Sequence, residues 1–346
     1  MDMIQQTEIY KLAQYSRTAG FIQNIGLDVL GFQPASLPGF SHLLLGTQQH
    51  NNTVVLEMGH GEALISTTAL SAPPVDDPYE FGRIASANAL NNVYATGGEP
   101  LLATAILGWP SDKIPTEVAE QVLEGSRALC AEAGIPLATG HRIESAEPFF
   151  GMTVTGKVRL NHLKQNNTAT EGCCLYLTKP LGFGIVTTAL QKELIQPYQV
   201  ETVLSQMAQL NKFGAFLGKL PYVKALTHVS GSALLGHLIE MAESSGLSAD
   251  IDFHKVPVLP ALSDYLAQDS IPEATHRNWE RFSDKTNELP DEQRFVLADP
   301  QINGGLLIAV DSRSGAEFEQ VAFEHKFHLK AFGQLIEKRE KVVYVR

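Results

Sequence analysis

The sequence predicts two α/β domains joined by a short polar linker, and three observations lead to this prediction. The chain has 346 residues, which is long for a single hydrophobic core. Segments with strand and helix periodicity alternate along most of it. The polar stretch RLNHLKQNNTATEG, at 159–172, separates two such alternating regions. We therefore expect an N-terminal domain over 1–158 and a C-terminal domain over 170–346.

The N-terminal region alternates apolar runs with longer amphipathic segments. A helix is expected from Pro78 to the Gly97-Gly98 pair, since glycine is a common helix stop. A second helix is expected over 115–133, with Gly134 as its stop. The first two strands should pair across the turn GHGE. Strands are predicted at 53–58, 62–69, 101–108 and 149–158.

The C-terminal region continues the alternation of strands and helices. Its predicted strands lie at 174–182, 222–227 and 304–310 and in the tail 328–346. Its predicted helices lie at roughly 183–193, 201–218, 230–244 and 314–325. No internal repeat or low-complexity tract interrupts either region.

Composition excludes several classes of protein. Acidic residues outnumber basic residues, 38 against 26, and the formal net charge is −12, which repels nucleic acid and anionic membranes. No apolar run approaches the roughly 20 residues that cross a bilayer, and the N-terminus lacks the pattern of a signal peptide. The chain has 3 cysteines without metal-site spacing, which favours a reducing compartment. We expect a cytoplasmic protein.

Common catalytic motifs are missing from the sequence. It contains no GxxxxGK[ST], HExxH, GxSxG or CxxC, and GFGIVTT lacks the third glycine of a dinucleotide loop. Two longer strings are distinctive instead: ATGGEPLLATAILGWP at 95–110 and ADPQINGGLLIAV at 298–310. Further strings of this kind are QYS, ISTT, DPYEFGRIASANA, GHRI, EPFFGMTVTGKV, LTKPLGFG and GSALLGHLIEM.

Together, in this order and spacing, these strings resemble the selenophosphate synthetases (selenide, water dikinases) of the aminoimidazole ribonucleotide synthetase-like superfamily. The resemblance runs from about residue 12 to the C-terminus. It implies two α/β domains with mixed sheets flanked by helices, and a homodimer that joins the sheets of the two N-terminal domains. The apolar face and edge of the strand at 62–69 would suit such a dimer.

The resemblance also shows where this chain departs from the family pattern. A glycine-rich N-terminal loop of the family carries a nucleophilic Cys or selenocysteine and then an essential Lys; the matching stretch TAGFIQNIG has Phe21 and Asn24 there. Five aspartates of the family pattern are also replaced. Their positions hold Asn51, Asn52, Ala69, Asn92 and His228.

These replacements bear directly on metal and nucleotide binding. Mg²⁺ with a polyphosphate prefers anionic oxygens, and Asn keeps the shape of Asp without its charge. We therefore expect no magnesium at Asn52, Asn92 and His228 and no catalytic group at Phe21 and Asn24. Whether ATP or another nucleotide binds stays open. The candidates for nucleotide contacts are Gln49, His50, Asn51, Ala69, Asn92, Gly140, His141 and Arg142, most of them in segments that match nucleotide-contacting loops of the family.

Alternatives remain for several of these residues. Asn88, Asn91 and Asn92 share one helix face and indicate either a polar cavity or interface, or relics satisfied by hydrogen bonds. His50, His141 and His228 could be structural or could ligate a transition metal.

Three functions follow from these readings. The first is a selenophosphate synthetase-like pseudoenzyme with a binding or regulatory role and a protein partner in selenium metabolism. The second is an enzyme of altered chemistry that acts on a nucleotide or another phosphate-bearing substrate. The third is a structural interaction module.

Overall fold

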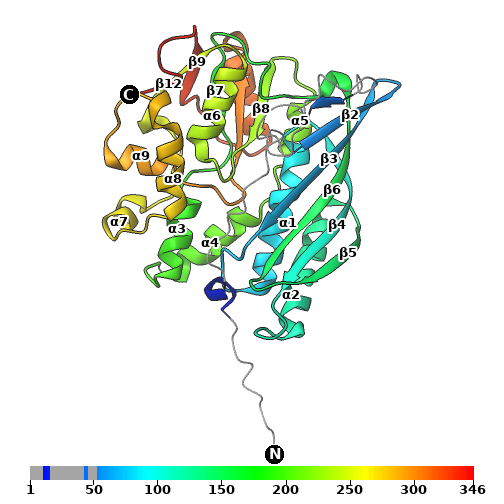
Figure 1. Cartoon of the computed structure of the whole chain (residues 1–346). Helices are drawn as coiled ribbons and strands as arrows, with labels where there is room; N and C mark the ends of the chain where they lie inside the picture. The colour runs from blue at the N-terminus through cyan, green and yellow to red at the C-terminus, as the bar shows by residue number, and fades with distance from the viewer. Residues whose placement is uncertain (1–10, 16–42, 46–52, 196) are drawn as a thin grey trace, which may run out of the picture.

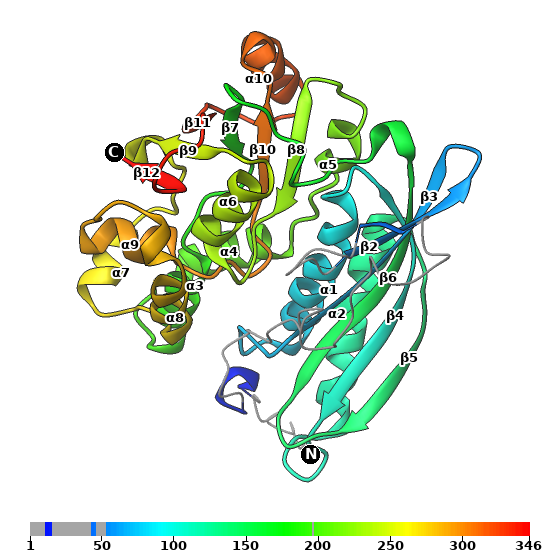
Figure 2. The same cartoon turned by 45° about the horizontal axis from the view of Figure 1, so that its top comes forward.

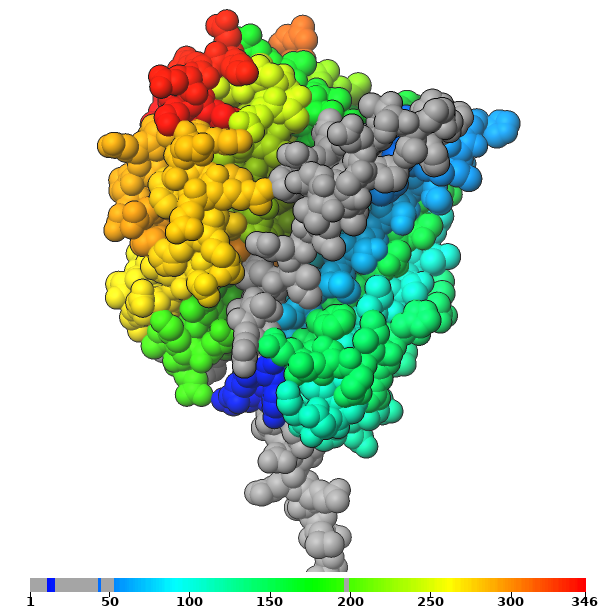
Figure 3. All heavy atoms as spheres, in the orientation of Figure 1, coloured from blue at the N-terminus to red at the C-terminus, as the bar shows by residue number. Residues whose placement is uncertain are grey.

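The computed structural model describes residues 11–15, 43–45, 53–195 and 197–346. Their strands form two six-stranded sheets, one in each half of the chain, and helices flank both sheets (Figure 1). The space-filling view places the strands of the first sheet on one side of the molecule and the C-terminal orange and red segments on the opposite side (Figure 3). The predicted α/β class with two mixed sheets is confirmed.

The first sheet has the strand order β1-β2-β3-β6-β4-β5, and only β4 and β5 pair in parallel. Helices α1 and α2 lie on one face of it, and the opposite face carries no described helix (Figure 2). The element bounds are β1 Leu43–Leu45, β2 Thr53–Gly59, β3 Glu62–Ser71, α1 Pro78–Tyr94, β4 Glu99–Trp109, α2 Thr116–Ala133, β5 Leu137–Glu144 and β6 Phe149–Arg159.

The second sheet has the order β12-β9-β11-β7-β10-β8. Helix α6 packs against one face, while a cluster that includes Phe213 and Phe318, from α5 and α10, covers the other. The element bounds are β7 Cys174–Leu177, α3 Phe183–Gln191, α4 Pro197–Ala208, α5 Phe213–Leu217, β8 Val223–His228, α6 Ala233–Ser244, β9 Ser248–Ile251, α7 Leu262–Ala267, α8 Glu273–Phe282, α9 Asp291–Leu297, β10 Leu306–Val310, α10 Gly315–Glu324, β11 Gly333–Ile336 and β12 Val343–Val345.

Helix α1 is the element that positions the candidate site. It begins where Asp77 accepts a hydrogen bond from the Glu80 backbone N–H at 2.8 Å, with Pro78 in the first turn. The helix is buried on most sides, because it lies between the first sheet and the C-terminal half of the chain (Figure 2). Its apolar residues on both faces, such as Phe81 and Leu90, follow from this position.

Two glycines let α1 and α2 pack backbone against backbone. A Cβ atom on Gly82 would lie 2.0 Å from the carbonyl oxygen of Val122, and a Cβ atom on Gly125 would lie 2.0 Å from that of Tyr79. Either methyl group would therefore push the two helices apart.

We expect Gly82→Ala to lower the free energy of unfolding by about 1–3 kcal/mol, the usual cost of overpacking a core. Denaturant or thermal unfolding measures this change. The exposed Glu120→Ala on α2 is the control, with an expected change within about 0.5 kcal/mol. Equal stability of the Gly82→Ala variant would contradict the close packing of the helices.

Three expectations from the sequence need correction. The helix predicted over 201–218 is two helices, because the chain breaks between α4 and α5 to hydrogen-bond with α1. The strand at 62–69 is no edge, since β3 pairs with both β2 and β6. The strand β5, which was not predicted, forms an edge of the first sheet.

Two further observations concern membrane-spanning helices and disulfide bonds. Within the described ranges, no helix is long and apolar enough to span a membrane. Cys130, Cys173 and Cys174 are all free thiols.

Candidate functional site

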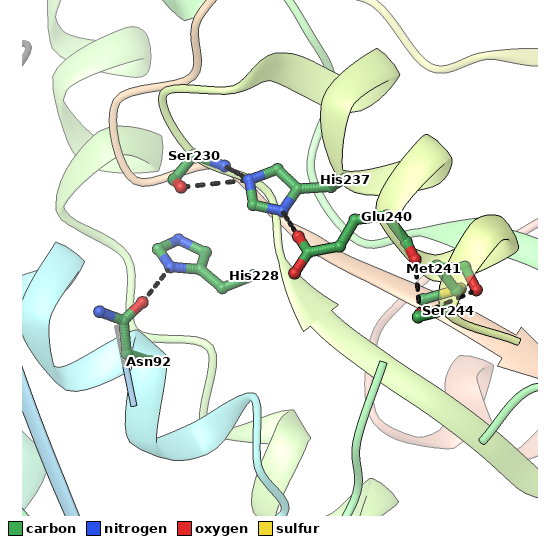
Figure 4. A network of polar contacts seen from close by, with 7 residues as sticks. All are labelled: Asn92, His228, Ser230, His237, Glu240, Met241 and Ser244. Atoms are coloured by element: carbon green, nitrogen blue, oxygen red, sulfur yellow. Dashed lines mark hydrogen bonds and ion pairs between the residues drawn. The ribbon is translucent and has the colours of Figure 1, made fainter. Parts of the chain in front are cut away.

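The candidate site lies where α1 of the N-terminal half meets the end of β8. Asn92, near the end of α1, donates from Nδ2 to Thr67 Oγ1 at 3.2 Å. Its Oδ1 lies 3.0 Å from Nδ1 of His228, the last residue of β8 (Figure 4). The structure thus brings together two of the residues at which we expect the sequence to depart from the family pattern, and it pairs them with each other.

The pair is held in place by strand β3 and by the second sheet. Thr67 and Ala69 are both buried and lie two residues apart on β3, so they face the same side of the sheet. His228 pairs with Leu306 in the β8–β10 ladder. Both halves of the chain therefore contribute regular, paired elements to the site.

His228 is uncharged at neutral pH. Burial, reinforced by the positive charge of Lys179 and by His237, lowers the pKa of His228 to about 3. The residue is 5% exposed, and its Nε2 has no hydrogen-bond partner among the described residues. The imidazole of His228 is therefore neutral and supplies no negative charge to the site.

A second histidine lies beside the first. His237, on α6, accepts a hydrogen bond at Nε2 from the backbone N–H of Ser230 at 3.1 Å, so its Nδ1 carries the proton in the neutral ring (Figure 4). Nδ1 lies 4.0 Å from Oε2 of Glu240, one helical turn further along α6. Burial lowers the pKa of His237 to about 4 and raises that of Glu240 to about 7.

These side chains surround a cavity of about 70 Å³. A cavity of this size and polarity holds a few water molecules or a small polar group. Three side-chain atoms of its lining residues have no hydrogen-bond partner within the described part of the chain: Nε2 of His228, Nδ1 of His237 and Oδ1 of Asn166. Thr53, which directly follows Asn52 in the chain, lines it as well.

A group of buried polar residues borders the site and joins the two halves of the chain. This polar seam consists of Asn91, Lys179, Asn211 and Asn303. Asn91 donates from Nδ2 to Asn303 Oδ1 at 2.6 Å and accepts at Oδ1 from the backbone N–H of Asn211, also at 2.6 Å. The ammonium group of Lys179 donates to the carbonyl oxygens of Gln209 and Asn303, at 2.8 and 3.0 Å. Burial lowers the pKa of Lys179 to about 7. The amide-rich face of α1 therefore serves an interface as well as the cavity.

The described donors do not fit a magnesium ion. Mg²⁺ requires carboxylate or phosphate oxygens in octahedral geometry, whereas Asn92 is already bonded to Thr67 and His228. In the part of the chain that the structure describes, no group of three or more His, Cys, Asp and Glu side chains is arranged to hold a metal. The site offers amides, imidazoles and hydroxyl groups, with Glu240 as its carboxyl group.

The structure does not bring all the predicted nucleotide contacts to this cavity. Gly140, His141 and Arg142 lie on the exposed edge strand β5 and are part of a strand instead of a loop. Arg142 donates to Thr116 Oγ1 at 3.4 Å and to Ser111 Oγ. The remaining predicted residues lie outside the described ranges: Phe21, Asn24, Gln49, His50, Asn51 and Asn52.

Sequence reasoning did not single out Lys179, His237 and Glu240. Each has a weak signal in the sequence. Lys179 ends an apolar run, CLYLTK, where a buried charge is rare. His237 and Glu240 lie three residues apart in GHLIEM, on one face of a predicted helix.

Both halves of the chain match models of known protein families. Residues 50–158 match the family model described as "AIR synthase related protein, N-terminal domain", and residues 170–346 match the model of the C-terminal domain. The chain is 46% identical to selenide, water dikinase of Pseudomonas putida over 342 residues, which is 98% of this chain and 99% of the relative. It is 45% identical to the protein of the same name from Bordetella bronchiseptica, over 97% of this chain and 98% of the relative.

Solved structures with the same fold are more distant in sequence. Thiamine-monophosphate kinase from Stenotrophomonas maltophilia aligns with a TM-score of 0.65 at 18% identity, over 89% of this chain and 92% of its own. The hydrogenase maturation protein HypE, solved in complex with ATP, aligns with a TM-score of 0.63 at 16% identity, over 90% of this chain and 87% of its own.

Proposed function

Because the chain belongs to the selenide, water dikinase family of AIR synthase related proteins, we propose that it is a member without selenophosphate synthesis that retains a binding role. One observation carries this proposal. Asn92 and His228, at two positions where the family resemblance implies aspartate, form a neutral pair 3.0 Å apart, in which His228 is buried and Asn92 is half-buried. Phosphoryl transfer depends on charge stabilisation by metal ions and their carboxylates, and a neutral pair supplies none.

The ligand of this binding role is a nucleotide in our proposal. A neighbour in fold was solved with ATP, and another with AMPPCP and TMP. The domains at 1–158 and 170–346 would hold the nucleotide between them without magnesium. A regulatory protein partner in selenium metabolism, and a cytoplasmic location, complete the proposal; a HypE–HypF complex among the neighbours in fold is a precedent for a protein partner.

We expect ATP to bind equally well with and without Mg²⁺. Isothermal titration should give dissociation constants within about threefold of each other, less than about 0.7 kcal/mol, because no described carboxylate set recruits the metal. Binding that requires Mg²⁺ would contradict the proposal. No binding under either condition would instead favour the structural interaction module.

Glu240 favours a second candidate, an enzyme of altered chemistry. Its pKa of about 7 is suited to proton transfer at neutral pH, and it lines the cavity beside His237. ATP hydrolysis by the purified protein that is lost in Glu240→Gln would support this candidate over the pseudoenzyme.

We further propose a homodimer through the uncovered face of the first sheet. On β2, Val54, Leu56 and Met58 are 42%, 37% and 60% exposed, and Leu102 on β4 is 39% exposed. A sheet face with several exposed apolar side chains and no covering helix is commonly covered by a second copy.

Light scattering at micromolar concentration should therefore give twice the chain mass of 37.7 kDa. Leu56→Arg together with Leu102→Arg should give the monomer mass, because two charges would be buried in the apolar interface. Phe323→Arg is the control: Phe323 is 58% exposed on α10, away from this face, and its variant should remain a dimer. A wild-type monomer would overturn this proposal.

A further inference from the structure

A second, larger cleft lies at the other side of the α1 terminus, where the two halves of the chain meet. Its volume is about 380 Å³, within the range of small-molecule sites. Strand ends of the first sheet form one wall, with Lys157 and Arg159 on β6. The other wall comes from the C-terminal half, with Lys219 just after α5. His162, in the segment that links the two halves, completes the lining.

The floor of this cleft is fixed by backbone packing. A Cβ atom on Gly97 would lie 2.4 Å from the carbonyl oxygen of His162, and one on Gly218 would lie 2.9 Å from the same oxygen. The linking segment is anchored nearby by Lys164, whose Nζ donates to the carbonyl oxygens of Leu220 and Val223 at 2.9 and 2.8 Å. The cations around the cleft are therefore carried by three segments in close, ordered contact.

Among the residues that the structure describes, the cations of the cleft have no hydrogen-bonded or ion-paired side chain of their own. The side chains of Lys157, Arg159 and Lys219 form no hydrogen bond or ion pair with another residue in the described ranges. Glu62 lies opposite Arg159 in the β3–β6 ladder, and Glu99 opposite Lys157 in the β4–β6 ladder. The two carboxylates offset two of the three cations and leave a positive excess, in a chain whose net charge is −12.

The pKa of His162 depends on the charges around the cleft. Burial is the largest cause that lowers its pKa, and the positive charges of Arg159, Lys219 and Lys164 lower it further; Glu99 alone acts in the opposite sense. An anion bound among these cations would cancel part of their field and raise the pKa of His162. A rise in the pKa of His162 therefore indicates that an anion occupies the cleft.

We propose that this cleft is a second ligand site, which binds a small hydroxylated anion of the phosphate-ester or hydroxycarboxylate class. Lys219, Arg159 and Lys157 would bind the charged group through charge-assisted hydrogen bonds. Glu62 and Glu99 would accept hydrogen bonds from hydroxyl groups of the same ligand. Since both halves contribute to the cleft, an occupant would bridge them. This site is separate from the cavity around Asn92 and His228 and does not depend on the function proposed for that cavity.

The test is a titration of the full-length protein with glycerol 3-phosphate and, in a second arm, with citrate, at low ionic strength. We expect saturable binding of at least one probe by calorimetry, and the arm that binds more tightly identifies the class. The C2 proton of His162, followed by NMR, should show a higher pKa in the saturated protein.

Variants complete the test. Lys219→Gln and Arg159→Gln should each weaken binding about tenfold or more, since a charge-assisted hydrogen bond contributes at least that factor. Lys219→Arg should retain most of the affinity. Lys338→Gln removes an exposed lysine on the C-terminal tail and should change nothing. Absence of saturation by both probes would overturn the proposal, and so would unchanged affinity in the Lys219→Gln and Arg159→Gln variants.

Discussion

The purified protein should form no AMP or selenophosphate from ATP and selenide above a control without protein. The reaction that the family resemblance implies needs a nucleophile or selenide carrier, a lysine near the phosphates and carboxylates that hold Mg²⁺. This chain has Phe21 and Asn24 at the first two positions. At the carboxylate positions within the described ranges it has Ala69, Asn92 and the neutral His228. The loss of one group that stabilises transition-state charge costs about 10²–10³ in kcat, so the combined loss should bring turnover below detection.

Phosphorus NMR of the reaction mixture measures this directly, with the Pseudomonas putida relative as positive control. Groups that act as one unit fail together, so Asn92→Asp alone should recover nothing. The combined variant Phe21→Cys, Asn24→Lys, Asn52→Asp, Ala69→Asp, Asn92→Asp and His228→Asp is the one in which activity should return. Turnover by the unmodified protein would refute the pseudoenzyme proposal, because neutral groups would then be sufficient for the reaction.

The double substitution Asn92→Asp and His228→Asp should make folding depend on magnesium. In the present protein the Asn92 oxygen lies 3.0 Å from a nitrogen of the buried His228, in the lining of the cavity. Two carboxylates at these positions would lie side by side, one of them buried, with like charges and without a counterion. We expect the variant to lose about 3 kcal/mol or more of its free energy of unfolding in the absence of metal, as when a buried charge loses its partner.

Magnesium should restore much of this loss, because a ligand that binds only the folded state stabilises it by mass action. Thermal unfolding with and without millimolar MgCl₂ measures the effect. Gln121→Glu, the same change from amide to acid on an exposed face of α2, should shift the unfolding midpoint little under either condition. If the double variant were as stable as the unmodified protein without magnesium, Asn92 and His228 could not form the close pair that the structure describes.

Much of the fold was predictable because it depends on local signals. Helix α1 begins at Pro78 and ends before Gly97, as its proline and glycine signals predict. The α4–α5 break was not predictable, because the cause lies 120 residues away: the backbone N–H of Asn211 is used by the side chain of Asn91. The periodicity of apolar residues gives no information about a hydrogen bond between residues so far apart in the sequence.

The site was predictable only in part. The pairing of Asn92 with His228 joins residues 136 positions apart, and comparison with a family pattern identified both as candidates. Gly140 to Arg142 were expected in a loop, but they pair along β4 as an edge strand, because β5 continues in register with β4 as far as Glu144. Glu240 was not predicted as a site residue. Its elevated pKa results from burial in the folded chain, and the sequence around a single helical glutamate does not indicate such burial.

The seam around Asn91 has a consequence for how this chain could change over evolutionary time. Its bonds to Asn303, Asn211 and Gln209 involve only amide and backbone groups. The next residue, Asn92, contacts a different set of groups, Thr67 and His228. A substitution at Asn92 would therefore leave the hydrogen bonds of Asn91 intact. The contact between the two halves of the chain would persist through a change of chemistry at the cavity.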